Sequence, residues 1–176
     1  NRKAVLSLHF PRLLFQIYVL LPAKTQACVI AAMDALEAYC EGEFGEVFGI
    51  ILTDRGSEFL NYEGMEASIE EGHRRCRVFY CDPMKPAQKG ACERNHVEYR
   101  KIVPKGTSID SLTQADMALI CSHVNSYPRA ARRQAPMKLA RIALPQSLLE
   151  NLGIEEIPSD EVIMTPELLA RTRHQF

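Results

Sequence analysis

The apolar run from Val47 to Leu52 restricts the possible folds of this chain more than any other segment. A nearly continuous apolar run of this length is typical of a strand that is covered on both faces of its sheet. The run ends at Thr53 and Asp54, and the sequence continues as TDRGSEF, which places a carboxylate where the buried strand reaches solvent. Because a sheet covered on both faces needs helices on each side, the run predicts an α/β architecture.

The segments around this run carry the periodicities of further strands and helices. Alternating apolar residues predict a hairpin of two strands, over residues 4–10 and 15–21. Thr25 resembles a helix cap, apolar residues follow it at helical spacing to Cys40, and the glycines at 42 and 45 are expected to end that helix. After it we expect a short helix near 65–71, a strand over 76–81, an exposed loop over 82–91 and a helix over about 92–102. A capping box of Thr113 and Asp116 opens the next helix. Three further helices are expected, one opened by Pro136, one opened by Pro145 and one that follows Pro166. This order predicts a mixed sheet with helices on both faces.

The length and composition allow one compact domain with a tail. A chain of 176 residues with 47% hydrophobic content can bury a sizeable core. We expect the core to cover residues 1–143 and an acidic, helical tail to cover residues 144–176. The longest uncharged apolar stretch, residues 13–23, contains Gln16 and Pro22 and is too short to cross a bilayer, so we expect a soluble intracellular protein.

The six cysteines are spread along the chain instead of being packed into a short, loop-rich segment. This distribution favours free thiols in a reducing compartment. The less favoured alternative is a zinc site formed by Cys76, Cys81, Cys92 and His96.

Charged residues are segregated along the chain, although the net charge is only −1. Residues 31–72 hold eleven acidic residues and one basic residue, residues 73–105 hold nine basic and three acidic residues, and residues 129–141 hold five basic residues and no acidic one. Such segregation can build a cationic surface that attracts a polyphosphate. Solvated helix faces are the simpler interpretation when charge is considered alone.

Two carboxylates stand out from the acidic residues by their positions. Asp54 follows a predicted strand, and Glu93 lies on a predicted helix beyond the exposed loop. If the fold brings them together, their mutual repulsion requires a cation between them, and oxygen ligands favour a hard divalent metal ion. The alternative is that Asp54 caps the next turn and Glu93 is an ordinary surface residue.

The motifs in this region resemble those of a known family. TDRGSEF is followed by YCDPMKPAQKGACERNHVEYRKIVPKGTSIDSLTQADMALICSHVNSYPR, and this order resembles the integrase-type catalytic core of bacterial insertion-sequence transposases, most of all the insertion-sequence-thirty family. The resemblance covers roughly residues 1–143. It implies a ribonuclease H-like mixed sheet flanked by helices, and metal-dependent cleavage and strand transfer of DNA with Mg²⁺ or Mn²⁺. It also implies double-stranded DNA of the element ends and target as the partner, a homo-oligomer, and a location in the bacterial cytoplasm, associated with the nucleoid.

The resemblance also implies roles for individual residues. The strand-end motif carries the second member of an Asp-Asp-Glu triad and the helical ERNH carries the third, so Asp54 and Glu93 become the catalytic residues and metal ligands. Arg100 lies two helical turns after Glu93 and is expected to hold a DNA phosphate. The further DNA contacts that we expect are Lys85, Lys89, Arg94, Asn95, His96 and Lys101. His96 is equally well interpreted as a plain polar helix residue, and Asn125 and Arg129 either serve DNA or hold the C-terminal helices.

Two departures from the family pattern matter. Arg55 replaces the usual asparagine after the aspartate. The first aspartate of the triad, which the family carries on a central opening strand before the hairpin, has no counterpart, and the absence of that strand would leave backbone groups unpaired inside the sheet. We therefore expect this chain to be a fragment of a longer transposase that is inactive alone, with the gap filled by residues outside it, by a partner chain or by a rearranged sheet. The alternative functions are a structure-selective nuclease of the same fold and a catalytically inactive DNA-binding or dimerisation remnant.

Overall fold

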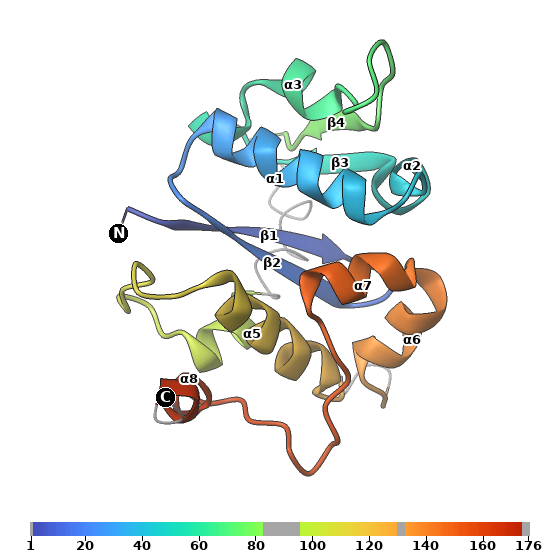
Figure 1. Cartoon of the computed structure of the whole chain (residues 1–176). Coiled ribbons are helices and arrows are strands. Elements are labelled where there is room, and N and C mark those ends of the chain that lie inside the picture. The colour runs from blue at the N-terminus through green and yellow to red at the C-terminus, as the bar shows by residue number, and fades with distance from the viewer. Residues whose placement is uncertain (1, 83–95, 130–132, 174–176) are drawn as a thin grey trace.

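The computed structural model describes residues 2–82, 96–129 and 133–173, which combine helices and strands as predicted for an α/β protein (Figure 1). The strands are β1 (Ala4–Phe10), β2 (Phe15–Leu21), β3 (Ile50–Thr53) and β4 (Arg77–Tyr80). The helices are α1 (Gln26–Tyr39), α2 (Phe44–Phe48), the 3-10 turn η1 (Ser57–Phe59), α3 (Tyr62–Glu66), α5 (Gln114–Ser126), α6 (Pro136–Ala143), α7 (Gln146–Leu152) and α8 (Glu167–Arg173). Residues 96–102 are also helical. None of the helices in the described residues has the length and hydrophobicity needed to span a membrane.

The predicted hairpin and the helix after it are confirmed. Strands β1 and β2 pair antiparallel, with Ala4 opposite Leu21 and Phe10 opposite Phe15. Thr25 caps α1 by accepting a hydrogen bond from the Cys28 N–H, 3.2 Å away. Of the two glycines expected to end this helix, the one at 42 follows its C-terminal end with a φ of 95°, whereas the one at 45 lies inside α2.

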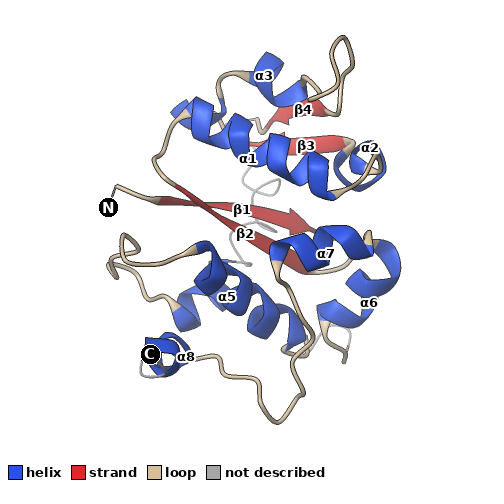
Figure 2. Ribbon diagram, in the orientation of Figure 1, coloured by secondary structure: helices blue, strands red, loops and turns tan. Residues whose placement is uncertain are grey.

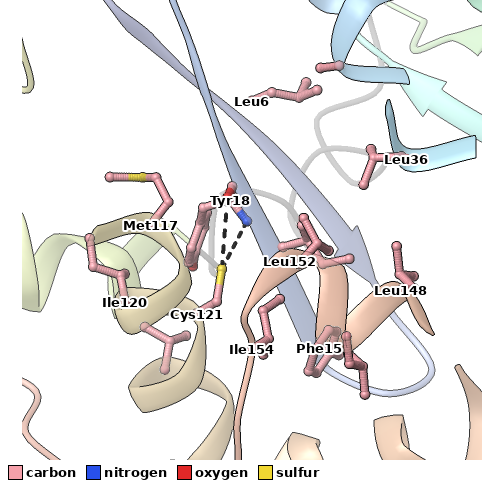
Figure 3. Close-up of a cluster of buried hydrophobic side chains, with 14 of the residues drawn as sticks. Leu6, Phe15, Tyr18, Leu36, Met117, Ile120, Cys121, Leu148, Leu152 and Ile154 are labelled. Carbon is pink, nitrogen blue, oxygen red and sulfur yellow. Dashed lines mark hydrogen bonds between the residues drawn. The ribbon is translucent and has the colours of Figure 1, made fainter. Parts of the chain in front are cut away.

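Helix α5 covers the outer edge of β2 with its side chains. The capping box of Thr113 and Asp116 is confirmed at its start. Three alternate backbone N–H groups of β2 donate to side chains of α5: Gln16 to Asn125 Oδ1 (2.9 Å), Tyr18 to Cys121 Sγ (3.1 Å; Figure 3) and Leu20 to Gln114 Oε1 (2.8 Å). Because a bare strand edge leaves backbone groups without partners, this helix replaces a neighbouring strand.

The apolar run from Val47 to Leu52 folds differently from its prediction. Val47 belongs to α2, the strand begins only at Ile50, and the side chains of Ile50 and Leu52 are 74% and 51% exposed. The prediction of a strand covered on both faces is therefore wrong for the described structure, because apolar content alone does not separate a helical turn from a strand. The short helix predicted near residues 65–71 is also displaced, since α3 begins at Tyr62, where the side chain of Asn61 accepts from the Gly64 N–H.

The four described strands form two separate sheets instead of one mixed sheet (Figure 2). Strands β3 and β4 pair in parallel, and they do not pair with the hairpin. A cavity of about 260 Å³ lies between the two sheets, lined by residues 6–11 of β1 and its turn and by residues 50–53 of β3. Side chains of α1, including Val29 and Met33, also line it. The edges of β1 and β3 that border this cavity have no strand partner in the described part of the chain.

The C-terminal residues pack against the rest of the molecule. Leu148, Leu149 and Leu152 of α7 are buried in the same hydrophobic cluster as the apolar stripes of α1 and α5. Leu148 and Leu152 are shown in Figure 3. The segment after α7 crosses α5, where three side chains accept from its backbone: Ser122 from Glu155 N–H (2.9 Å), Ser126 from Ile157 N–H (2.9 Å) and His123 Nδ1 from Ile163 N–H (3.0 Å). The tail is thus tied to α5 by backbone hydrogen bonds as well as by apolar contacts.

Candidate functional site

Asp54 follows the last residue of β3 and is exposed to solvent. Its Oδ1 accepts a hydrogen bond from the Gly56 N–H at 2.9 Å, so the side chain closes a tight turn immediately after the strand. Strand β4 runs alongside, and the Cys81 N–H donates to the Thr53 carbonyl at 2.7 Å. The turn-capping role considered for Asp54 is therefore present, and it leaves the carboxylate at the carboxyl end of the parallel pair.

A second carboxylate lies in the same loop. A Cβ atom on Gly56 would lie 2.8 Å from Glu58 Oε2 and 3.0 Å from Asp54 Oδ1, so the glycine leaves room for both acidic side chains. Glu58 forms an ion pair with Lys24 at 3.3 Å, and only 12% of its side chain is exposed. Glu58 carries no predicted role, although its position in the motif TDRGSEF is a signal that could have identified it.

Arg55, which departs from the family pattern, lies against an aromatic ring of the neighbouring strand. Its guanidinium carbon is 5.6 Å from the centre of the Tyr80 ring. The Tyr80 hydroxyl donates to the Phe59 carbonyl. These contacts connect both ends of the TDRGSEF loop to β4.

Several predicted site residues lie outside the described residues: Glu93, Lys85, Lys89, Arg94 and Asn95. The approach of Glu93 to Asp54 therefore stays a prediction. No group of three His, Cys, Asp or Glu side chains in the described ranges is placed to hold a metal ion. Asp54 itself supplies a carboxylate oxygen at the surface, which is the ligand type that Mg²⁺ and Mn²⁺ prefer.

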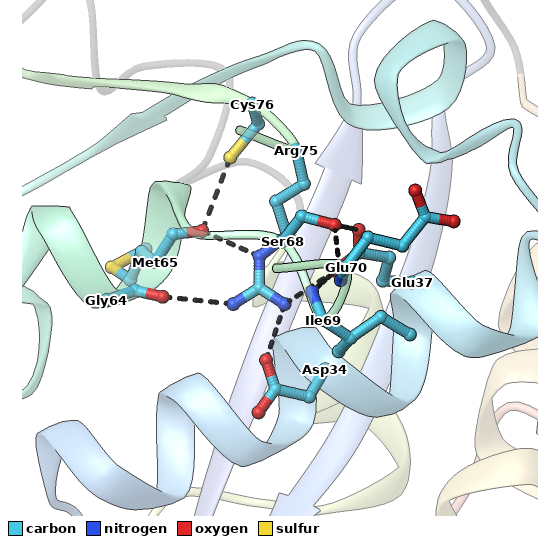
Figure 4. A network of polar contacts seen from close by, with 9 residues as sticks. All are labelled: Asp34, Glu37, Gly64, Met65, Ser68, Ile69, Glu70, Arg75 and Cys76. Atoms are coloured by element: carbon cyan, nitrogen blue, oxygen red, sulfur yellow. Dashed lines mark hydrogen bonds and ion pairs between the residues drawn. The ribbon is translucent and has the colours of Figure 1, made fainter. Parts of the chain in front are cut away.

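The chemistry of Cys76 does not favour the zinc alternative. Its thiol is buried and donates to the Met65 carbonyl at 3.5 Å (Figure 4). Burial raises the pKa of this thiol to about 11, so it keeps its proton and its hydrogen bond when no metal ion is bound. Cys92 lies outside the described residues, and the five described cysteines are free thiols, as predicted for them.

Three predicted DNA contacts lie on the helical segment 96–102, and the structure separates them. His96 and Arg100 are exposed and line one cavity of about 290 Å³. Lys101 forms an ion pair with Glu98 at 2.9 Å, and its ammonium lies 5.0 Å from the centre of the Tyr127 ring. The structure thus brings His96 and Arg100 to one cavity, whereas Lys101 stays at the surface and is paired with Glu98.

Asn125 and Arg129 connect α5 to the segments that pack against it. Asn125 is fully buried, and its Nδ2 donates to the carbonyls of Gln16 (2.6 Å) and Cys121 (2.8 Å). Arg129 pairs with Glu98 at 3.1 Å and donates to the Val124 carbonyl at 3.1 Å. The contacts match the second of the two roles considered for these residues, which is to fix helices.

One member of the basic block 73–105 lies inside the molecule (Figure 4). The Arg75 side chain is 0% exposed and binds Asp34 at 2.6 Å and Glu37 at 3.1 Å. It also donates to the carbonyls of Gly64 and Met65. Because its charge is neutralised internally, Arg75 does not contribute to the expected cationic surface.

Comparisons with known proteins give partial matches to transposases and an integrase. No protein-family model matches the chain. The chain is 32% identical over 76 residues to the transposase for insertion sequence element IS1086 of Cupriavidus metallidurans, and the match covers 43% of this chain and 21% of that protein. It is 28% identical over 97 residues to the transposase InsI for insertion sequence element IS30A of Escherichia coli K12, covering 55% of this chain and 22% of that protein.

A third relative is viral. The chain is 33% identical over 85 residues to a putative integrase, ORF3, of Spiroplasma virus SpV1-R8A2 B, covering 48% of this chain and 24% of that protein. In each case the chain matches less than a quarter of the relative's own length. These similarities confirm the resemblance to insertion-sequence-thirty transposases that the motifs indicated.

Proposed function

From the premise that this chain is a relative of the insertion-sequence-thirty transposases, we propose that it is part of the catalytic core of a transposase. Its function is then metal-dependent DNA strand cleavage and strand transfer. The observation that carries the proposal is the position of Asp54, which is exposed at the carboxyl end of β3 in the motif TDRGSEF. Ligands of open α/β sheets bind at the carboxyl ends of the strands, which is where this carboxylate lies.

In this proposal Asp54 and Glu93 hold Mg²⁺ or Mn²⁺, and a third carboxylate completes the set. Such ions activate an attacking hydroxyl and stabilise the leaving oxygen of a phosphodiester. Asp54 has its orientation fixed by the Gly56 N–H, so its carboxylate is held in place before a metal ion binds. Arg100 holds a DNA phosphate near this position.

The cavity between the two sheets supports a ribonuclease H-like arrangement. Strand β3 begins beside α2, at the end of the molecule toward which β1 points, so β1 and β3 run in opposite directions (Figure 1). An extended segment in the cavity can therefore pair antiparallel with β1 and parallel with β3 at the same time. Such a segment joins the two sheets into one mixed sheet and satisfies both strand edges.

The proposed domain limits, partners and location follow from the similarity to insertion-sequence-thirty transposases. The catalytic core comprises residues 1–143, and residues 144–176 form an acidic, helical tail whose α7 packs into the hydrophobic cluster of the core. The partners are double-stranded DNA of the element ends and target, together with further copies of the protein, and the location is the bacterial cytoplasm at the nucleoid.

The test uses the intact gene product with labelled terminal-repeat DNA and Mg²⁺ or Mn²⁺. We expect joined products from the wild type and no cleavage by the Asp54→Asn variant. This variant is expected to keep its DNA binding, because the substitution changes a metal ligand and not a phosphate contact. The control is Asp160→Asn, which removes the same charge from an exposed position in the tail and is expected to stay active. Cleavage without joining would indicate a nuclease, and DNA binding without any cleavage by the wild type would indicate an inactive remnant.

A further inference from the structure

A cavity on the hairpin combines cationic and hydroxyl side chains. It has a volume of about 290 Å³ and lies between β1, β2, the helical segment 96–102 and the loop that follows it. Its described lining includes His96, Arg100 and Lys105, the hydroxyl residues Ser7 and Thr107, and no carboxylate. A site that gathers cations without a neighbouring acid attracts an anion.

Arg100 and Lys105 differ from the other basic residues nearby because neither forms an ion pair with a described residue. Lys101 and Arg129 both pair with Glu98. Arg100 instead packs its guanidinium 5.8 Å from the centre of the Tyr99 ring. The charges of Arg100 and Lys105 are thus not neutralised by the described part of the protein.

The loop that carries Lys105 is fixed in position. It forms a turn in which the Thr107 N–H donates to the Pro104 carbonyl at 3.1 Å, and Gly106 takes the left-handed φ of 90° that this turn requires after Lys105. Farther along, Asp110 Oδ1 accepts from two backbone N–H groups at the start of the hairpin, those of Arg2 (2.8 Å) and Lys3 (2.9 Å). The Lys3 ammonium donates to the Leu112 carbonyl at 2.7 Å. A loop held in this way fixes the backbone position of Lys105, so only the lysine side chain has to be ordered on binding.

A buried hydroxyl group at the wall of the cavity has no partner in the described structure. Tyr99 is 6% exposed, and its ring lies 5.0 Å from that of Tyr18, with an angle of 53° between the rings. The Tyr18 hydroxyl donates to Gln16, whereas the Tyr99 hydroxyl has no hydrogen-bond partner. Burial raises the pKa of Tyr99, so its hydroxyl keeps its proton and remains a donor. Buried donors of this kind are uncommon, but the oxygen has almost no exposed surface, so this hydroxyl lies behind the cavity wall and is not counted among the ligand contacts.

We propose that this cavity binds one backbone phosphate of double-stranded DNA, with Lys105 as a phosphate contact beside Arg100. The inference rests on the proposed function for the identity of the polymer and adds Lys105, Ser7 and Thr107 to the DNA-binding surface. Arg100 donates from its planar fork of N–H groups, Lys105 supplies a point charge, and the hydroxyl groups donate to the remaining oxygens. Because such contacts do not read the bases, the site sets the position of DNA and not its sequence preference.

The experiment measures DNA binding by the intact gene product in EDTA, so that metal-dependent chemistry plays no part. We expect Lys105→Gln to weaken binding about three- to tenfold for every duplex sequence, and to lower the slope of log K against log salt by ~0.9. Lys105→Arg keeps the charge and is expected to restore most of the affinity. The control is Arg12→Gln, which removes one positive charge from an exposed position in the turn between β1 and β2, outside the basic blocks, and is expected to leave both quantities unchanged.

The outcomes separate this inference from the proposed function. If Lys105→Gln matches Arg12→Gln in affinity and salt slope, the inference is wrong, whether or not the protein cleaves DNA. If the wild type cleaves nothing but its DNA binding depends on Lys105, the cavity is a DNA site and the proposed chemistry fails. Binding of inorganic phosphate is measured as well. If Lys105→Gln abolishes saturable phosphate binding but leaves DNA binding unchanged, the assignment of the cavity to DNA is overturned. Thermal unfolding of each variant confirms that the fold is retained.

Discussion

Asn125→Ala tests whether this side chain holds the fold or serves DNA. Asn125 is fully buried and bridges α5 to the edge of β2, accepting from the Gln16 N–H and donating to the Gln16 carbonyl. Gln16 is 1% exposed, so alanine leaves one buried donor and one buried acceptor without partners. Each unsatisfied group costs about 1–3 kcal/mol, which gives a loss of about 2–6 kcal/mol in the free energy of unfolding.

Urea unfolding followed by circular dichroism measures this loss. With a slope of about 2 kcal/mol per M, the midpoint is expected to fall by about 1–3 M. Asn151→Ala is the control, because Asn151 is exposed on α7 and donates only to the Ser147 carbonyl of its own helix, and a change below about 0.5 kcal/mol is expected there. The reasoning is refuted if Asn125→Ala unfolds like the wild type and loses DNA binding instead.

Two further predictions concern buried charge and pH. Arg75→Met removes the cation bound to Glu37, whose side chain is 11% exposed, and to Asp34, whose side chain is 45% exposed. We expect a loss of about 3–5 kcal/mol in urea unfolding, because the Glu37 carboxylate stays buried without its cation. A loss below about 1 kcal/mol would contradict this reasoning. Burial lowers the pKa of both His9 and His123 in the folded protein. Below about pH 6.5 the unfolded chain therefore binds more protons than the folded protein. The free energy of unfolding is expected to be highest above that pH and to fall as the pH drops below it. Unfolding curves between pH 8 and pH 5 measure this, and the decrease is expected to shrink in His123→Gln, whereas stability that rises toward pH 5 would contradict it.

Local patterns were sufficient to predict most elements of the fold. Alternation predicted the β1–β2 hairpin, and the cap at Thr25 and the capping box at Thr113 predicted the starts of α1 and α5. These features depend on residues close in sequence, so the sequence carries them directly. The boundary between α2 and β3 was not predictable in this way, because Val47 and Ile50 are equally apolar and the difference depends on what surrounds them.

Long-range polar contacts were the main part that the sequence did not reveal. Arg75 was grouped with the other basic residues, but its acidic partners Asp34 and Glu37 lie about forty residues earlier in the chain. Asn125 was considered as a DNA contact, although its position four residues after the buried Cys121 was a signal for an internal hydrogen bond. Burial decides the role of such side chains, and burial depends on the packing of distant segments.

Candidate site residues were predicted from motifs, and packing then distinguished among them. Arg100 and Lys101 are neighbours of the same charge, but only Lys101 pairs with Glu98. Lys105 had no predicted role beyond its membership of the basic block 73–105. Its position in the same cavity as Arg100 depends on the turn at Gly106 and on the contacts that anchor the loop to the hairpin, and the sequence does not show these.

The most direct test is the position of Mn²⁺ in a crystal structure of the intact gene product, located by its anomalous scattering. The account predicts an ion coordinated directly by carboxylate oxygens of both Asp54 and Glu93. Mn²⁺ bound elsewhere, with the carboxylates of Asp54 and Glu93 on different sides of the molecule, would contradict it.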